Sequence, residues 1–203
     1  MPDSRKHLQR ILNQLWTDFI QTSRFLYTAA FQSECQKIFG TTAGAAVLAV
    51  TTEACLQAGI LGLARLTIPD KESVTIWYLL DFLRNHPQLF PDISRTKLIT
   101  LREEMQQTIQ AHEELLKKVQ HWRDRSLAHR DRKWINNPEH LASSELSPAE
   151  LKTLLGAVRD ILLQACLLLE TDSLDSPDHS ELLDDLHALW ESGSGTPPSD
   201  SIA

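Results

Sequence analysis

Arginine, aspartate and histidine side chains crowd into one short segment in the second half of the chain. Residues 122–133, WRDRSLAHRDRK, contain four arginines, two aspartates and one histidine. A guanidinium group is a planar, permanently charged donor that matches phosphate geometry, and an imidazole exchanges protons near neutral pH. This segment therefore predicts a phosphate site with a proton-transfer group. The plainer interpretation is a solvated helix end whose cations complement the helix dipole.

Helical geometry favours the functional interpretation of this segment. His129 follows Trp122 by seven residues, so at about 100° per residue the two side chains point within about 20° of each other. A histidine on that apolar face, with Arg125 one turn before it, does not belong to a solvated surface. Arg123 lies about 120° around an ideal helix from His129. We therefore expect either a helix break near Ser126 or convergence with a second subunit.

The same residues carry a resemblance to a known family. An arginine, a polar follower and a histidine after four to six intervening residues, at the end of a long helix in an all-α chain, resemble the motif of the HEPN (higher eukaryotes and prokaryotes nucleotide-binding) superfamily. Arg123, Asp124 and His129 fit this motif with five intervening residues. The block RDRSLAHRD at residues 123–131, together with residues 62–83, is similar to the AbiU-type abortive-infection branch of that superfamily.

The resemblance implies a helical bundle that pairs with itself and joins two copies of the motif into a metal-independent ribonuclease site. It makes His129 the general acid or base, Arg123 the stabiliser of phosphoryl charge, and Asp124 the residue that orients Arg123. The other cations of the segment are expected to contact RNA: Arg125, Arg130, Arg132 and Lys133. The implied partners are RNA, a second copy and an antitoxin such as a nucleotidyltransferase.

An alternative function follows from the same resemblance. The superfamily also contains members that only bind, and its typical asparagine at the follower position is Asp124 in this chain. The alternative is therefore a catalytically inactive module that binds RNA, a nucleotide or a partner protein.

Other chemistries lack the residue spacing that they require. The histidines at positions 112, 121, 129 and 140 have no metal-ligand spacing, and Asp184 with His187 forms a single D-x-x-H where a di-iron bundle needs two E-x-x-H motifs. No Lys-Ser or Lys-Thr follows the glycines near residue 60, and no serine or cysteine lies in a nucleophile elbow. We therefore expect no metal and no cofactor, and we interpret His112 as a hydrogen-bonded core histidine.

The charge distribution divides the chain into a basic and an acidic part. Residues 1–133 contain 18 Lys/Arg and 14 Asp/Glu, whereas residues 134–203 contain 2 and 13. With a net charge of −7 and one basic segment, residues 117–133, the chain is expected to have a local anion site and no general affinity for nucleic acid. The acidic end after residue 170 is interpreted as a solubilising tail, and the alternative is that it competes with RNA for the basic segment.

Helical periodicity predicts an all-α bundle that positions the basic segment. The chain has 203 residues, of which 42% are hydrophobic and 23% charged, and these values exclude a disordered or fibrous protein. Apolar residues recur at three-to-four spacing over residues 4–39 and 43–66, and no strand pattern appears. Ser73 is the expected cap of a short third helix that stops before Pro87.

The longest periodic run is expected to start at Asp92 or Ser94 and to continue into the basic segment as one helix. A seven-residue repeat along it predicts an apolar seam, with Thr108 and His112 in two of the inward positions. The seam consists of Leu98, Leu101, Met105, Leu115, Val119 and Trp122. It can pack against another helix of the chain or against a second copy.

The clearest local signal comes from Ser147, Pro148 and Glu150, which form a capping box at the start of a helix. The body of that helix, residues 151–170, is apolar almost all round and is expected to be buried. A last amphipathic helix is expected at residues 179–191. We predict one domain over residues 1–192, followed by a disordered tail at residues 193–203.

Residues 38–64 are the one stretch that suggests a membrane helix. Their glycines and threonines favour a helix buried at the centre of the bundle instead. The amino terminus carries charged residues throughout and does not resemble a signal peptide. Three widely separated cysteines, Cys35, Cys55 and Cys166, are interpreted as buried thiols. Together these features predict a cytoplasmic protein without membrane contact.

Overall fold

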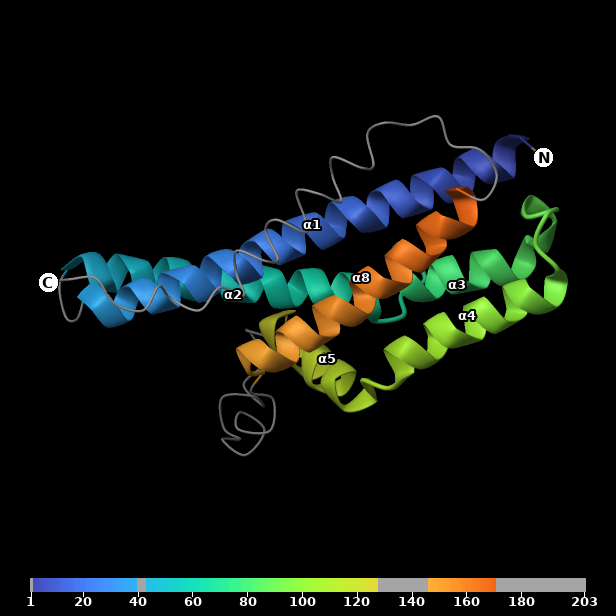
Figure 1. The fold of residues 1–203 in the computed structure, drawn as a ribbon. Helices are drawn as coiled ribbons and strands as arrows, with labels where there is room; N and C mark the ends of the chain where they lie inside the picture. Colours follow the sequence, from blue (N-terminus) through green and yellow to red (C-terminus); the bar gives the residue numbers. More distant parts are fainter. Residues whose placement is uncertain (1, 40–42, 128–145, 171–203) are drawn as a thin grey trace, which may run out of the picture. The chain divides into compact units, whose positions relative to one another are not determined.

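Six α-helices and a short 3₁₀ turn make up the part of the chain that the computed structural model describes, residues 2–39, 43–127 and 146–170 (Figure 1). In chain order the elements are α1 (Pro2–Phe39), α2 (Ala43–Thr67), α3 (Ile76–Asn85), η1 (Pro87–Leu89), α4 (Arg95–Gln110), α5 (Glu113–Leu127) and α8 (Pro148–Glu170). The described residues contain no strand, which confirms the predicted all-α fold. They lie within one unit, Met1–Asp172. The predicted helix at 179–191 and the boundary near residue 192 lie outside them.

The core forms where α8 packs on α1 and α4. Leu8, Ile11, Leu15 and Phe19 of α1 are each at most 3% exposed, and their three-to-four spacing places them on one face of the helix. One face of the α8 body from Leu151 to Leu168 supplies the opposite apolar surface, whereas Leu167 is 58% exposed, so the expected burial of this helix is correct for that face only. The first half of α1 and nearly all of α8 are thus fixed by burial of apolar side chains.

The expected burial of the three cysteines is wrong. Cys35, Cys55 and Cys166 are all half-buried thiols, and none forms a disulfide. The Cys166 Sγ accepts a hydrogen bond from Trp16 Nε1 at 3.1 Å, which adds a polar contact between α8 and α1.

Two glycines allow α2 to approach α1 closely. A Cβ built on Gly59 would lie only 2.6 Å from the Cγ atom of Leu26. A Cβ built on Gly62 would overlap the side chain of Thr22. Thr22 is 2% exposed and donates its hydroxyl to the Asp18 carbonyl at 2.6 Å, so its side chain has no room to turn aside. The helices therefore need a glycine at position 62 to pack at this separation.

We expect Gly62→Ala to destabilise the fold by about 1–3 kcal/mol, because an added methyl group overfills a packed contact. Gly156→Ala is the matched control, since a Cβ on Gly156 of α8 meets nothing within 4 Å. There the loss of backbone freedom in the unfolded chain should stabilise the protein by about 0.4–1 kcal/mol. Urea denaturation of both variants measures the two changes in the free energy of unfolding. Changes of the same sign in both variants would contradict this account of the α1–α2 contact.

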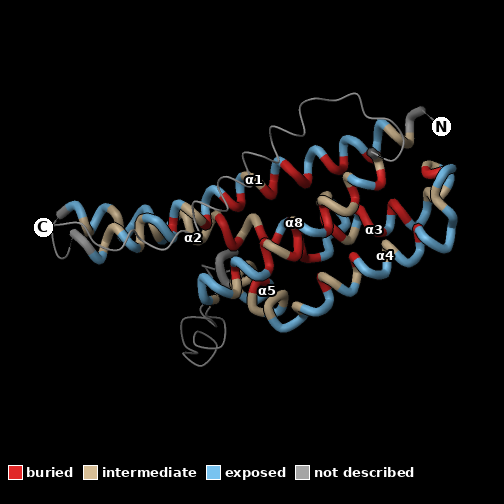
Figure 2. The backbone as a smooth tube through the Cα atoms, in the orientation of Figure 1, coloured by how far each residue is buried: buried red, intermediate tan, exposed pale blue. Residues whose placement is uncertain are grey.

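The expected burial of the second helix at the bundle centre is correct only for its later half. From Gly59 onward α2 contributes buried residues such as Leu63, whereas none of its described side chains before Gly59 is buried. The outer ends of α1 and α2 run side by side, blue and tan in Figure 2. Phe31, Val47 and Val50 are 71%, 65% and 71% exposed there. The apolar composition of α2 predicted that the whole helix is buried, but a helix is buried only where other helices surround it.

The same helix is long and apolar enough to cross a membrane. The stretch Gly44–Thr67 has 24 residues, and the 18 consecutive residues within it that are most apolar have a mean hydropathy of 1.6, with 17% of them buried. Among the described residues it is the one helix with these properties. A lone helix of this kind is weak evidence, so the expectation of no membrane contact stays a prediction.

The cap of α3 is Thr75, two residues after the predicted Ser73. Thr75 has extended backbone angles, and its hydroxyl oxygen accepts from the Tyr78 N–H at 3.2 Å. Ser73 instead donates its hydroxyl to Asp70 Oδ2 at 2.9 Å, and the Glu72 N–H donates to Asp70 Oδ1 at 3.1 Å. The prediction failed because two hydroxyl residues lie close together and Asp70 engages the first in an Asx turn.

The predicted single helix from residue 94 to the basic segment is wrong, because it is divided into α4 and α5. At the junction the His112 N–H donates to the Ile109 carbonyl at 3.2 Å, and the His112 carbonyl accepts from the Leu116 N–H at 2.9 Å. Neither glycine nor proline marks this break. Glu113 and Glu114 fall in the first turn of α5, where the helix dipole favours carboxylates. His112 is thus a half-buried junction residue, not the predicted core histidine.

Ser94 caps α4 as predicted, and the apolar seam is buried within one chain at three of its six positions. Leu98, Met105 and Val119 are at most 4% exposed, whereas Leu101, Leu115 and Trp122 are half-buried. Ile109, which follows Met105 by four residues on the same face of α4, is the buried residue before the junction, and not the expected Thr108. Only the half-buried part of the seam is thus left for contact with a second copy.

Candidate functional site

The last turns of α5 carry Arg123 and Asp124, two of the three predicted catalytic residues. The Nε and Nη2 atoms of Arg123 both donate to Asp124 Oδ1, at 2.9 and 2.8 Å. The Arg123 side chain is 29% exposed. Among the described residues Asp124 is the hydrogen-bond partner of this guanidinium, and it engages two of the five N–H donors. The predicted contact between the two side chains is therefore present.

A loop from elsewhere in the chain lies within electrostatic range of Arg123. The pKa of Asp70 is lowered, first by the Glu72 N–H and the Ser73 hydroxyl, and to a smaller extent by the charge of Arg123. This proximity follows from the packing of α5 against α2, which ends just before Asp70. The sequence could indicate the turn at Asp70 but not its nearness to Arg123, because the two residues are far apart in the chain.

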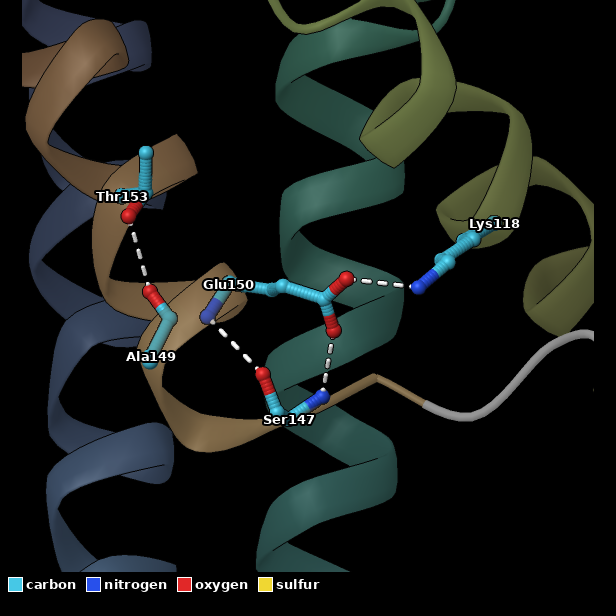
Figure 3. Close-up of polar contacts among 5 residues, drawn as sticks. All are labelled: Lys118, Ser147, Ala149, Glu150 and Thr153. Atoms are coloured by element: carbon cyan, nitrogen blue, oxygen red, sulfur yellow. Dashed lines mark hydrogen bonds and ion pairs between the residues drawn. The ribbon is translucent and has the colours of Figure 1, made fainter.

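An ion pair fixes α5 to the start of α8. The predicted capping box is present, because Ser147 Oγ accepts from the Glu150 N–H at 3.2 Å and Glu150 Oε2 accepts from the Ser147 N–H at 2.8 Å (Figure 3). Glu150 Oε1 accepts from Lys118 Nζ at 2.5 Å. These contacts, with Lys118 the largest, lower the pKa of Glu150 to about 2. The ion pair at Lys118 thus fixes α5 a little more than one turn before Arg123.

We expect Glu150→Gln to lower the melting temperature at pH 7 and to have less effect as the pH falls. The folded pKa of Glu150 is about 2 and its ordinary value is 4.5. The stabilisation by its carboxylate is therefore complete above the ordinary pKa and is lost as the pH falls through about 2. Glutamine still completes the capping box, so only the charge is removed. Thermal unfolding followed by circular dichroism from pH 7 down to pH 2 measures the difference.

Glu114→Gln is the control for this prediction, since Glu114 is an exposed residue of α5 that pairs with Lys117 within the same helix. Such a surface pair contributes little. A melting-temperature difference for Glu150→Gln that does not change with pH would contradict the assigned role of the carboxylate.

The two lysines at the start of the basic segment are neutralised within the protein. Lys117 Nζ lies 3.0 Å from Glu113 Oε1 and 2.8 Å from Glu114 Oε1, and these carboxylates raise its pKa. Lys118 is paired with Glu150. Arg123 is paired as well, but its guanidinium has five N–H donors and Asp124 engages two of them. Among the described cations of the segment it therefore has the most donors that no described residue engages.

The other predicted site residues lie outside the described part of the chain. These are His129, Arg130, Arg132 and Lys133, together with the side chain of Arg125, whose backbone belongs to α5. The meeting of Arg123 with His129, through a break near Ser126 or through a second subunit, stays a prediction. Within the described residues no group of three or more His, Cys, Asp or Glu side chains is placed to hold a metal ion.

A comparison with known protein families identifies the family of this chain. The model of the AbiU2 family of HEPN proteins matches residues 5–191, a range that runs from α1 past α8 and includes Arg123 and His129. No match was found among curated proteins or among solved structures. The matched range covers most of the chain, and the described residues form the helical bundle that this family implies. The chain therefore belongs to the AbiU2 family, the abortive-infection branch of the HEPN superfamily.

Proposed function

We propose that the protein is a metal-independent endoribonuclease that cleaves RNA as part of a prokaryotic defence or toxin–antitoxin system. The observation that carries this proposal is the Arg123 guanidinium, which Asp124 holds through two hydrogen bonds. A fixed guanidinium stabilises charge that develops on phosphoryl oxygens during cleavage. His129, six residues later in the matched family range, supplies the proton-transfer group.

The reaction uses the ribose 2′-hydroxyl as nucleophile. His129 either accepts the 2′-hydroxyl proton, while water protonates the departing 5′-oxygen, or as imidazolium donates a proton to that oxygen, while water accepts the 2′-hydroxyl proton. A bond forms between the 2′-oxygen and phosphorus, and the bond from phosphorus to the 5′-oxygen breaks. The products are a 2′,3′-cyclic phosphate and a 5′-hydroxyl. Arg123 contacts the phosphoryl oxygens throughout, and Asp124 limits its rotation.

We further propose that the active form is a homodimer in the cytoplasm. On an ideal helix Arg123 and His129 point about 120° apart, so two copies give a direct way to bring them together. Because Leu98, Met105 and Val119 of the seam are buried within one chain, the interface uses the half-buried part of the seam or another surface. An antitoxin such as a nucleotidyltransferase would neutralise the active protein. The cations at positions 125, 130, 132 and 133 would hold the RNA backbone.

The direct test incubates purified protein in EDTA with a labelled RNA and with the matching DNA. We expect cleavage of the RNA, with 2′,3′-cyclic phosphate ends detected by mass spectrometry, and an intact DNA strand because it lacks the 2′-hydroxyl. A requirement for Mg²⁺, or cleavage of DNA, would contradict the mechanism.

A specific observation favours a second candidate, the catalytically inactive module that binds RNA, a nucleotide or a partner protein. Asp124 places a carboxylate directly on Arg123, and a negative charge there opposes phosphate binding. RNA binding in a gel-shift experiment without any cleavage would support this candidate.

A further inference from the structure

A cavity of about 300 Å³, which is widely open to solvent, lies between the first turns of α1 and the end of α3. Its lining includes Ser4, His7 and Arg10, which follow one another at three-residue intervals along α1, and Phe82 and His86 from the end of α3. The loop near Arg123 precedes the other end of α3, a ten-residue helix about 15 Å long. The cavity is therefore separate from the candidate cleavage site.

Stacked rings form one wall of this cavity. The His86 ring lies on Phe82 with centroids 4.1 Å apart and an interplanar angle of 16°, and the His7 ring is tilted against Phe82 at 5.2 Å. Phe82 is 8% exposed, so it is anchored in the core. The two histidines are thus held in place before any ligand arrives, which lowers the cost of binding.

The hydrogen bond of His86 defines what its outer nitrogen can do. His86 Nδ1 lies 3.0 Å from the Phe82 carbonyl oxygen. A carbonyl oxygen only accepts, so Nδ1 carries a hydrogen and Nε2 of the neutral ring holds a lone pair. That Nε2 atom can accept a proton from an acidic hydroxyl of a ligand and then donate to the resulting anion.

The charge of the cavity favours an anion. Arg10 is exposed, and no hydrogen bond or ion pair engages it within the described part of the chain. The described lining contains no carboxylate, and Asp81 on α3 is paired with Arg84 at 3.0 Å. A guanidinium group, a hydroxyl group and an imidazole around an aromatic wall are suited to a phosphate that carries a planar base.

We propose that this cavity binds the phosphate monoester of a single nucleotide, with Arg10 and Ser4 donating to its oxygens and His86 sharing its proton. A phosphate monoester can retain one hydroxyl proton, and this proton can form a hydrogen bond with the lone pair on His86 Nε2. An internal phosphodiester of RNA has no such proton. The volume, at the lower end of the range for small-ligand sites, suits one nucleotide. The ligand is either a free nucleotide or the 5′-phosphorylated end of an RNA strand.

Isothermal titration with AMP and with adenosine tests the phosphate requirement. We expect AMP to bind at least tenfold more tightly than adenosine, and Arg10→Gln to weaken AMP binding at least tenfold. Arg24→Gln is the matched control, because Arg24 is also exposed on α1 but lies about 21 Å further along the helix, and it should bind AMP as the unaltered protein does. Arg123→Gln should also leave AMP binding unchanged, which separates this site from the cleavage site.

The source of the phosphate is identified with 2′-O-methyl oligonucleotides, which cannot be cleaved by 2′-hydroxyl attack. If a 5′-phosphorylated oligonucleotide, but not AMP, shows the tenfold dependence on Arg10, the ligand is an RNA end. If AMP shows it, the ligand is a free nucleotide. The proposal is overturned if neither probe binds more tightly than its phosphate-free counterpart, or if Arg10→Gln binds both as the unaltered protein does. These outcomes do not depend on whether the protein cleaves RNA.

Discussion

His129→Ala is expected to slow RNA cleavage by about 10²- to 10⁴-fold, because the reaction loses its proton-transfer group. RNA binding should persist, since the cations of the segment are unchanged. Cleavage rates are measured under single-turnover conditions, together with affinity by fluorescence anisotropy. His121→Ala is the control: His121 is an exposed residue of the same helix as Arg123, and its replacement should change neither quantity. A variant that keeps its full rate without His129 would move the assignment to the inactive binding module.

Arg123→Ala is expected to slow cleavage by about 10²- to 10³-fold, because charge that develops on the phosphoryl oxygens loses a fixed donor. Arg123→Lys should recover only part of the rate, since an ammonium group lacks the planar fork. Arg159→Ala is a matched control. Arg159 on α8 donates Nε and Nη2 to Asp160 Oδ1 at 3.0 and 2.8 Å, the same local geometry as the Arg123–Asp124 pair. Equal losses in the two variants would show that the effect is not specific to the site.

Mixing the two inactive variants tests whether the site is shared between copies. If Arg123 of one copy acts with His129 of the other, a mixed dimer of Arg123→Ala and His129→Ala chains contains one intact site. Activity should then return to about a quarter of the original value in an equal mixture, because about half of the dimers are mixed. If both residues act within one copy, the mixture stays inactive. Sedimentation of the unaltered protein as a monomer with full activity would exclude the shared site.

Local signals in the sequence predicted the parts of the fold that depend on neighbouring residues. The caps at Ser94 and Ser147 and the start of α8 are set by hydrogen bonds within four residues, and all are present. The break at His112 was missed because the apolar spacing continues across it. The exposure of the outer half of α2 was missed because composition does not reveal how many helices surround a segment.

The contacts of the candidate site are likewise of two kinds, those between neighbouring residues and those between helices that are distant in the chain. The contact of Arg123 with Asp124 joins adjacent residues, so the motif could predict it. The influence of Arg123 on Asp70 and the pairing of Lys118 with Glu150 depend on how helices pack, which no short motif encodes. The wall of rings at Phe82 and His86 is local, yet His7 joins it only through the packing of α1 on α3.

The paired outer ends of α1 and α2 have a consequence for hydrogen exchange. In residues 44–58 no side chain is buried, so few apolar contacts resist the local separation of the two helices. Amide protons there exchange when the two helices separate locally, whereas amide protons near Leu15 or Leu63 exchange only when the core unfolds. Backbone protection should therefore decline along α1 from its first half towards Phe39 and rise again along α2 from Gly44. The two longest helices are thus each stable at one end and labile at the other.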